Sequence, residues 1–396
     1  MSLRKLQVQY ITGAHRRLRR MGIYIHVPFC AKKCAYCDFY SLTDDASMDA
    51  YVKALCVDFR RSRTDLAGAS VDTVYFGGGT PGLLGHKRLA QLLKKLRSNF
   101  EITADAEITL ETNPATLTGE DYAKLVRAGF NRISFGVQSL DDGELATLGR
   151  IHTSEDARAA VKAARTAGFQ NISIDIMFGL PGQSEESLGR TLSEAIALEP
   201  EHISFYGLKI EEGTPFHEMR DKLDLPDEDL YAKLYLLGAE KLTSAGYSHY
   251  EISNFAKPGL ESRHNLRYWK LNEYIGFGPA AHSYLNNTRY GITRDLNGYI
   301  SAVTAGQLPE RSESEPVEPE AQLREYIMMS LRLSTGINRM VYEARFGRSF
   351  EKPEEFFRRI SRGGLCVPTD NGWRLTAKGF LISNTIIVKL LQYLDE

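Results

Sequence analysis

The chain has 396 residues, of which 43% are hydrophobic and 25% charged, so its composition excludes a mainly disordered protein and allows one large core with a smaller domain. Its 49 basic and 50 acidic side chains give a formal net charge of -1, which excludes an overall field that would attract nucleic acid or an anionic membrane. No apolar stretch approaches the roughly 20 residues that span a bilayer, so we expect a cytoplasmic protein without an integral membrane segment.

Residues 1–20 form a basic segment, because several arginines and lysines occur there and no acidic residue precedes Asp38. This composition is compatible with a mitochondrial leader and also with residues that merely precede a start at Met21. We favour the second interpretation, since an apolar strand pattern begins directly after Met21. The fold is therefore expected to begin at that residue.

From the first strand to about residue 208, short apolar runs alternate with helical patterns, as in proteins with a buried parallel sheet. The expected strands are residues 22–27, 71–76, 106–111, 131–137, 171–178 and 201–207. The expected connecting helices are residues 121–128, 154–167 and 184–198, each opened by an acidic or hydroxyl residue that is suited to capping.

A short internal repeat supports this alternation, because AGFNRIS at residues 128–134 recurs as AGFQNIS at residues 167–173. Each copy reads as the end of a helix, a glycine cap and the start of the next strand. Repeated units of this kind predict an α/β fold with a parallel sheet, and we expect a full or partial (βα) barrel of the TIM type. Ligands then lie at the carboxyl ends of the strands.

The pattern changes after about residue 290, so we expect a barrel domain over residues 21–290 and a second domain further on. Residues 291–320 are predicted to be a linker, because 311–320 is rich in charge and contains proline and serine. Residues 321–396 read as two or three helices and a hairpin that turns at Asp370–Gly372, a winged-helix-like pattern. This domain is not markedly basic, so we expect it to pack or bind a partner and not nucleic acid.

Cys30, Cys34 and Cys37 lie so close in sequence that one loop can present three thiols to a single metal centre. A cubane [4Fe-4S] cluster held by three thiolates keeps its fourth iron open for a small chelating ligand. Two alternatives remain at this point: a zinc site completed by His26, and a closed cluster completed by Cys56. Cys56 and Cys366 otherwise stand alone, which does not resemble the disulfide framework of a secreted protein.

The CxxxCxxC spacing of this loop resembles the radical S-adenosylmethionine superfamily, and the resemblance runs from Tyr24 to about Tyr284. It implies that the open iron holds S-adenosylmethionine, that an electron donor protein reduces the cluster, and that reduction can split the ligand to a 5'-deoxyadenosyl radical. Several residues are expected to contact S-adenosylmethionine, mostly at strand ends: Tyr24, Gly78, Gly79, Thr80, Glu111, Gln138, Arg150 and Asp175. Among them, the planar fork of Arg150 suits the carboxylate of the ligand.

The phrases YIHVPFC, GGGTP, ETNP, GVQS, SIDIMFGLPGQ and IGFGPAAHSY resemble the oxygen-independent coproporphyrinogen oxidases and their relatives. The oxidase branch carries a fourth cysteine where this chain has Phe39, and a longer N-terminal segment. The HemW-type heme chaperone branch is marked by a histidine-asparagine and tyrosine-tryptophan element, which His264-Asn265 and Tyr268-Trp269 reproduce. The chaperone branch is therefore the closer match.

The resemblance implies a heme-binding protein that passes heme or a related tetrapyrrole to an acceptor protein. His264 is the candidate heme ligand, since neutral imidazole is a good axial ligand for heme iron, although a hydrogen-bonded core histidine would give the same pattern. The enzyme alternative is oxidative decarboxylation of coproporphyrinogen III to protoporphyrinogen IX. A radical enzyme with an unrelated substrate is a third possibility, because one fold hosts many functions.

Overall fold

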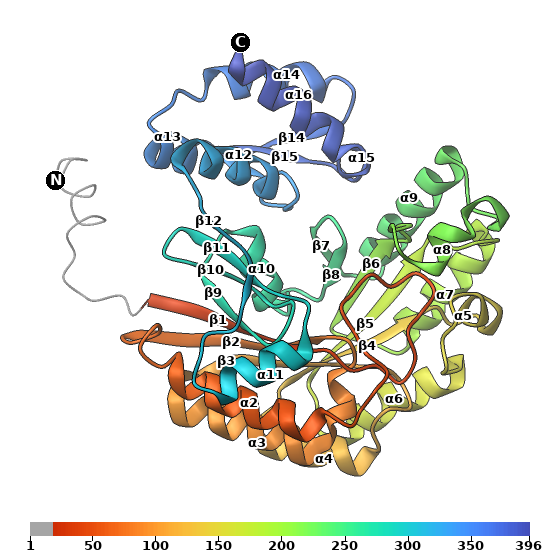
Figure 1. Cartoon of the computed structure of the whole chain (residues 1–396). Helices are drawn as coiled ribbons and strands as arrows, with labels where there is room; N and C mark the ends of the chain where they lie inside the picture. Colours follow the sequence, from red (N-terminus) through yellow and green to blue (C-terminus); the bar gives the residue numbers. More distant parts are fainter. Residues whose placement is uncertain (1–18) are drawn as a thin grey trace.

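The computed structural model describes residues 19–396, in which a curved sheet of 12 strands has helices along one face and the C-terminal elements on the other side (Figure 1). Six central strands run parallel in chain order. They are β1 (Arg19–Val27), β2 (Ala69–Gly78), β3 (Glu101–Thr112), β4 (Arg132–Gln138), β5 (Asn171–Phe178) and β6 (His202–Gly207). All the predicted strands are thus confirmed. The first begins at Arg19, and the rest of the predicted basic leader, residues 1–18, lies outside the described residues.

Helices lie between these strands and after β6, and the longer ones cover the outer face of the sheet (Figure 1). They are α2 (Met48–Arg61), η1 (Pro81–Leu84), α3 (Gly85–Asn99), α4 (Gly119–Ala128), α5 (Asp142–Thr147), α6 (Ser154–Ala167), α7 (Glu185–Ala197), α8 (Pro215–Glu218), η2 (Arg220–Lys222) and α9 (Glu228–Ser244). Thr118, Thr153 and Ser184 form capping boxes at the predicted helix starts. Gly129 and Gly168 end α4 and α6 at φ of 108° and 109°, which explains the repeated glycine.

The sheet continues beyond the six parallel strands at both sides. Its full order is β12-β11-β10-β9-β1-β2-β3-β4-β5-β6-β8-β7, with β9 parallel to β1 and the outer strands antiparallel. The added elements are β7 (Ser248–Glu251), β8 (Asn254–Ala256), α10 (Arg263–Trp269), β9 (Tyr274–Phe277), β10 (His282–Leu285), β11 (Thr288–Ile292), α11 (Leu296–Thr304) and β12 (Arg311–Pro316). The molecule is therefore an α/β partial barrel, as expected.

Residues 291–320 were predicted to be a linker. Most of them form α11 and β12, so the prediction was wrong for these two elements. Leu296, Tyr299 and Val303 of α11 are buried, and β12 pairs with β11 at the edge of the sheet. The Arg311 guanidinium lies 3.8 Å from the centre of a tyrosine ring of β11. Partner strands and rings that are distant in sequence create these contacts, so local composition does not reveal them.

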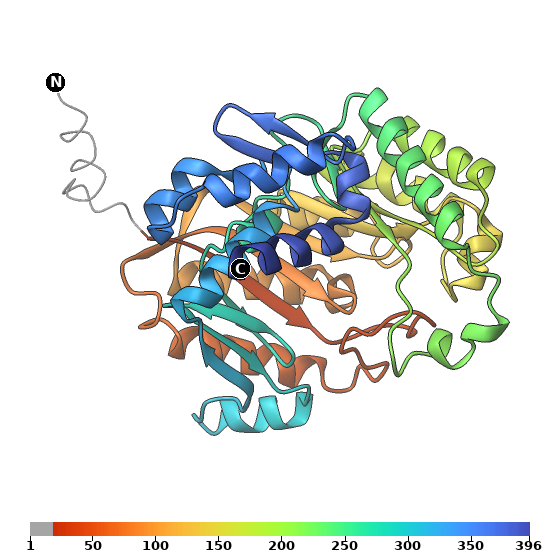
Figure 2. The same cartoon turned by 90° about the horizontal axis from the view of Figure 1, so that it is seen from above.

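The C-terminal elements combine helices with a small three-stranded sheet in the order β13-β15-β14. Seen from above, they lie over the large sheet of the barrel (Figure 2). They are α12 (Pro319–Ser330), β13 (Ile337–Asn338), α13 (Arg339–Phe346), α14 (Glu351–Ser361), β14 (Cys366–Thr369), β15 (Gly372–Leu375), α15 (Ala377–Leu381) and α16 (Ser383–Asp395). The hairpin predicted at Asp370–Gly372 is present, since β14 pairs antiparallel with β15. Hydrogen bonds from Ile252 N to Arg332 O, 2.9 Å, and from Ser334 N to Tyr250 O, 3.0 Å, join these elements to the barrel. Within residues 19–396 the helices are too short or too polar to cross a membrane.

Candidate functional site

The cysteine loop leaves the carboxyl end of β1 and closes on itself. Cys30 N donates to Leu42 O at 2.9 Å, and Leu42 N donates to Pro28 O at 2.8 Å. The two ends of the loop are therefore hydrogen-bonded to each other as neighbouring strands are. Cys30, Cys34 and Cys37 are free thiols, half-buried, and all line one cavity at the carboxyl ends of the parallel strands. A loop closed by these hydrogen bonds, with three thiols facing one cavity, provides the donor set that an open cubane cluster needs.

The glycine turn after β2 packs directly against this loop. Gly79 N donates to Val27 O at 2.9 Å and Thr80 N donates to Phe29 O at 2.7 Å. A side chain at Gly79 would place its Cβ 2.6 Å from Phe29 O and 3.1 Å from the Cys30 Sγ, so only glycine allows this approach. The Thr80 hydroxyl lies 3.5 Å from the Cys30 Sγ. The predicted glycine-rich contact is therefore placed beside the thiols.

Two carboxylates line the same cavity from neighbouring parts of the sheet. Glu111, at the end of β3, accepts a hydrogen bond from the Tyr75 hydroxyl and one from Gly78 N at 3.3 Å. Asp175, on β5, accepts from the Ser134 hydroxyl at 3.3 Å. Burial raises the pKa of Glu111 to about 7, and burial also raises the pKa of Asp175. Glu111 thus changes charge near neutral pH.

Arg150 reaches the thiols from the segment after α5. Its Nη1 donates to the Cys34 Sγ at 3.3 Å, and its Nη2 donates to Asn113 Oδ1 at 2.6 Å and to Gly136 O at 2.5 Å. Its Nε is buried and has no hydrogen-bond partner among the described residues. Three of its five N–H groups are thus used, and a ligand carboxylate would meet the Nε–H and the second Nη1–H. Further pairing requires the present partners of the guanidinium to be exchanged.

Gln138 ends β4 with a φ of 72°, a left-handed conformation that is uncommon outside glycine. Its Oε1 accepts a hydrogen bond from the Tyr206 hydroxyl at 2.7 Å, and both residues line the cavity. Tyr24, by contrast, does not line this cavity. Its hydroxyl lies 3.1 Å from His26 Nδ1 and its ring stacks on Tyr75, so the structure places it one layer deeper in the barrel.

The two alternatives for the cysteines fit the geometry less well. His26 is buried, and both of its ring nitrogens have partners, the Tyr24 hydroxyl and Tyr40 O at 2.9 Å, so it is not available to complete a zinc site. Within residues 19–396, no three His, Cys, Asp or Glu side chains are grouped around one position as a single metal ion requires. Cys56 packs against the core on α2 and does not line the cavity, so it does not complete a closed cluster.

The cavity itself has a volume of about 140 Å³, below the roughly 300 to 1,000 Å³ of common cofactor pockets. The donor set suits a cluster with a chelating ligand, but both groups together need more room. Phe39, 65% exposed at the rim, leaves that side of the loop open to solvent.

His264 lies in the barrel interior and not at its mouth. It is 1% exposed, its Nδ1 is 2.9 Å from the Thr73 hydroxyl and its Nε2 is 2.8 Å from the Tyr268 hydroxyl. Its ring also stacks on Tyr75 with 5.0 Å between the ring centres, and burial lowers its pKa to about 3. Heme ligation by His264 stays a prediction, and it requires the bond to Tyr268 to open and the ring to be uncovered.

Several residues at the site were missed by reasoning from the sequence. Tyr36, Asn113, Ser134 and Tyr206 all line the cavity. The strand period could have found Ser134, because every second residue of a strand faces the same side and Ser134 lies four residues before the predicted Gln138 on β4. No site residue was predicted on β6, so nothing in the sequence pointed to Tyr206. Arg132 lies on the inward face of β4 as well, 1% exposed, with two guanidinium nitrogens lacking partners in the described structure.

Comparisons with known proteins agree with this fold and loop. Residues 24–195 match the Radical SAM superfamily, and residues 317–382 match the HemN C-terminal domain. Among solved structures, the chain is similar to coproporphyrinogen III oxidase (HemN) from Escherichia coli, with a TM-score of 0.81 and 25% identity, covering 95% of this chain and 91% of that one. The fold and the site thus define a radical S-adenosylmethionine protein, a class that implies a [4Fe-4S] cluster and S-adenosylmethionine.

Similar proteins of known name identify the family within this class. Heme chaperone HemW from Bacillus subtilis is 35% identical over 368 residues, which are 92% of this chain and 97% of that protein. Heme chaperone HemW from Escherichia coli is 37% identical over 381 residues, covering 94% of this chain and 98% of that protein. The chain belongs to the HemW family of radical S-adenosylmethionine proteins.

Proposed function

We propose that this chain binds heme and passes it to an acceptor protein, with a [4Fe-4S] cluster and S-adenosylmethionine as its resident cofactors. The heme part is supported by the similarity to HemW proteins along more than nine-tenths of the chain. The cofactor part is supported by three free thiols, a glycine turn and two carboxylates on one cavity. In this proposal Cys30, Cys34 and Cys37 hold the cluster.

The other residues of the cavity bind and orient S-adenosylmethionine in this proposal. Gly78, Gly79 and Thr80 present backbone groups beside the thiols, and Arg150 offers its guanidinium to the ligand carboxylate. Glu111 and Asp175 accept hydrogen bonds from the ammonium and ribose hydroxyl groups. When bound, the reduced cluster supplies the electron that can cleave S-adenosylmethionine, and an electron donor protein supplies that electron in turn.

A pH titration tests the role of Glu111. Its pKa of about 7 means that the carboxyl is neutral below pH 7 and charged above it, and only the charged form accepts strong hydrogen bonds from the ligand. We therefore expect the affinity for S-adenosylmethionine to rise severalfold between pH 6 and pH 8, measured by equilibrium dialysis with the reconstituted protein. In Glu111→Gln the affinity should be low at both pH values. An unchanged pH profile in this variant would remove Glu111 from the site.

The enzyme alternative is favoured by one observation, the similarity of the whole fold to coproporphyrinogen III oxidase. Against it stands Phe39, which occupies the position of the fourth cysteine of the oxidase branch. Anaerobic incubation of the reduced holoprotein with coproporphyrinogen III and S-adenosylmethionine separates the two functions. We expect no protoporphyrinogen IX, and its formation would overturn the chaperone proposal in favour of the oxidase.

Heme binding and release are tested directly by optical titration of the holoprotein with hemin. We expect a shift of the Soret band that saturates at one heme per chain, followed by transfer to apomyoglobin as a heme trap. Serum albumin, a non-specific heme binder, serves as the control donor. If the Soret band of added hemin does not shift, the heme proposal is wrong.

A further inference from the structure

Arg132 brings a positive charge into the interior of the barrel. Its neighbours on β4, Ile133 and Phe135, are buried in the core outside the sheet, where Phe135 meets Tyr122 of α4 with 5.9 Å between the ring centres. The alternation of the strand therefore turns Arg132 inward. Its Nε and Nη1 are buried without a hydrogen-bond partner among residues 19–396, so no carboxylate pairs with it bidentately. A buried cation of this kind is costly unless a compensating charge acts on it from a greater distance.

Three carboxylates face the same interior from the strands on either side of β4. They are Glu107 and Glu111 on β3 and Asp175 on β5. Both oxygens of Glu107 are already used, because they accept backbone hydrogen bonds from Arg263 N and His264 N at 3.0 Å each. Glu111 and Asp175, which line the cysteine cavity, are left to interact with the charge of Arg132.

The strand register places these two carboxylates further toward the mouth of the barrel than Arg132. Arg132 pairs with Thr109 on β3 and with Asn171 on β5. Glu111 lies two residues beyond Thr109, and diagonal neighbours of this kind are about 7 to 8 Å apart, within reach of a long side chain. Asp175 lies four residues beyond Asn171. Arg132 itself does not line the cavity, so it can act on a ligand there only through these carboxylates.

The charge of Glu111 depends on the groups that surround it. From other elements, the titratable side chains packed around it are Tyr24 of β1, Tyr75 of β2, Asp175 of β5 and Tyr268 of α10, and across the cavity lie Arg150 and the three thiols. Burial raises the pKa of all three tyrosines, so they stay neutral. Burial also raises the pKa of Glu111, and the like charge of Asp175 adds to this effect, whereas the charge of Arg132 lowers it. Arg132 lowers the pKa of Asp175 in the same way.

We propose that Arg132 is a positioning residue for S-adenosylmethionine, which keeps Glu111 and Asp175 in the carboxylate form that accepts hydrogen bonds from the ligand. This inference rests on the proposed cofactor-binding function of the cavity and names the group that controls its charge. Two buried carboxylates on one cavity disfavour each other's ionisation, and a buried cation on their inner side offsets that repulsion. The cation needs no contact with the ligand for this purpose.

The first test measures the protonation of Glu111 directly. Arg132→Met keeps a long side chain without the charge, and Arg132→Lys keeps the charge. Infrared difference spectroscopy of the reconstituted full-length protein follows the C=O band of protonated carboxyl groups as the pH rises, and Glu111→Gln identifies the part of the band that belongs to Glu111. We expect the midpoint of this band to move up by about one pH unit in Arg132→Met and to stay near its original value in Arg132→Lys.

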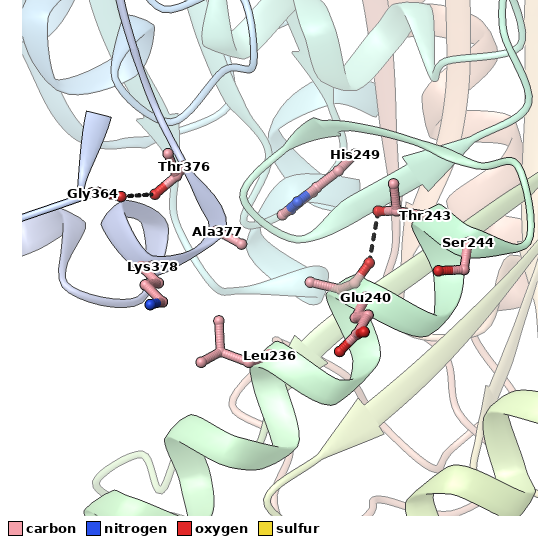
Figure 3. A pocket seen from close by; sticks show the side chains of 10 residues that line it. Leu236, Glu240, Thr243, Ser244, His249, Gly364, Thr376, Ala377 and Lys378 are labelled. Carbon is pink, nitrogen blue, oxygen red and sulfur yellow. Dashed lines mark hydrogen bonds between the residues drawn. The ribbon is translucent and has the colours of Figure 1, made fainter. Parts of the chain in front are cut away.

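The second test measures the affinity for S-adenosylmethionine by equilibrium dialysis. From a pKa of about 7, an upward shift of about one unit lowers the carboxylate fraction at pH 7 about fivefold, so Arg132→Met should bind about fivefold more weakly there. At pH 9 it should bind almost normally, whereas a purely structural role would weaken binding at every pH. Lys378→Met is the control for loss of a positive charge. Lys378 lies on α15 at the wall of a separate cavity that shares no lining residue with the cysteine cavity, and its variant should keep both profiles (Figure 3).

The outcomes separate this inference from the proposed function. If the unsubstituted protein does not bind S-adenosylmethionine, the proposed function fails. If it binds the ligand and Arg132→Met keeps either its infrared midpoint or its affinity at pH 7, this inference alone is overturned. Circular dichroism shows whether each variant is folded. We expect Arg132→Met to fold, because no hydrogen bond at Nε or Nη1 is lost, and Arg132→Gln decides the question if it does not.

Discussion

Replacing Cys34 with alanine should abolish the iron–sulfur cluster. Cys34, Cys30 and Cys37 face one cavity from a loop closed by paired backbone hydrogen bonds, and the described chain offers no fourth thiol there. With two thiolates left, a cubane cluster loses a third of its protein ligands and its anchoring to the loop. We expect the unsubstituted protein to reconstitute with about four irons and four sulfides per chain. The variant should hold little of either.

Iron and sulfide analysis with electron paramagnetic resonance measures this effect. The reduced, unsubstituted protein should give a [4Fe-4S] signal that changes when S-adenosylmethionine is added, and Cys34→Ala should give none. Cys56→Ala is the matched control, because that thiol packs against the core between helices and does not line the cavity. Loss of the cluster in Cys56→Ala, or zinc without iron in the unsubstituted protein, would contradict the assignment.

Replacing His264 with alanine should strongly destabilise the barrel. The substitution removes two buried hydrogen bonds, leaves the Thr73 and Tyr268 hydroxyls without partners, and opens a cavity beside Tyr75. Each unsatisfied buried group costs about 1 to 3 kcal/mol, so we expect the free energy of unfolding to fall by roughly 3 to 5 kcal/mol. Chemical denaturation followed by circular dichroism gives this value.

The same variant also decides what His264 does with heme. Both ring nitrogens are hydrogen-bonded inside the barrel, so ligation of heme by His264 requires the bond to Tyr268 to open. Under the prediction that His264 is the ligand, a folded His264→Ala protein should lose the Soret shift of heme. His282→Ala, with an exposed ring, is the stability control and should change the free energy of unfolding by less than about 0.5 kcal/mol. A normal Soret shift in a folded His264→Ala protein would instead show that the ring has a structural role alone.

Much of the architecture follows from local patterns in the sequence. The strands from β1 to β6 are short apolar runs, and α4, α6 and α7 begin at residues whose side chains cap them. The repeated Ala-Gly-Phe marks helix ends because glycine adopts the left-handed cap conformation without strain. These features depend on neighbours in the sequence, so the chain by itself determines them. The spacing of the three cysteines is local in the same sense.

The tertiary structure alone decided the features that join distant segments. Arg150 meets Cys34, and Tyr206 meets Gln138, because parallel strands bring their carboxyl ends together. β12 forms only because β11 offers it an edge, although its sequence reads as a linker. Both ring nitrogens of His264 are engaged, one by the Thr73 hydroxyl of β2 and the other by the Tyr268 hydroxyl of α10. A sequence pattern identifies an imidazole, but whether its nitrogens are free depends on the side chains that packing places around them.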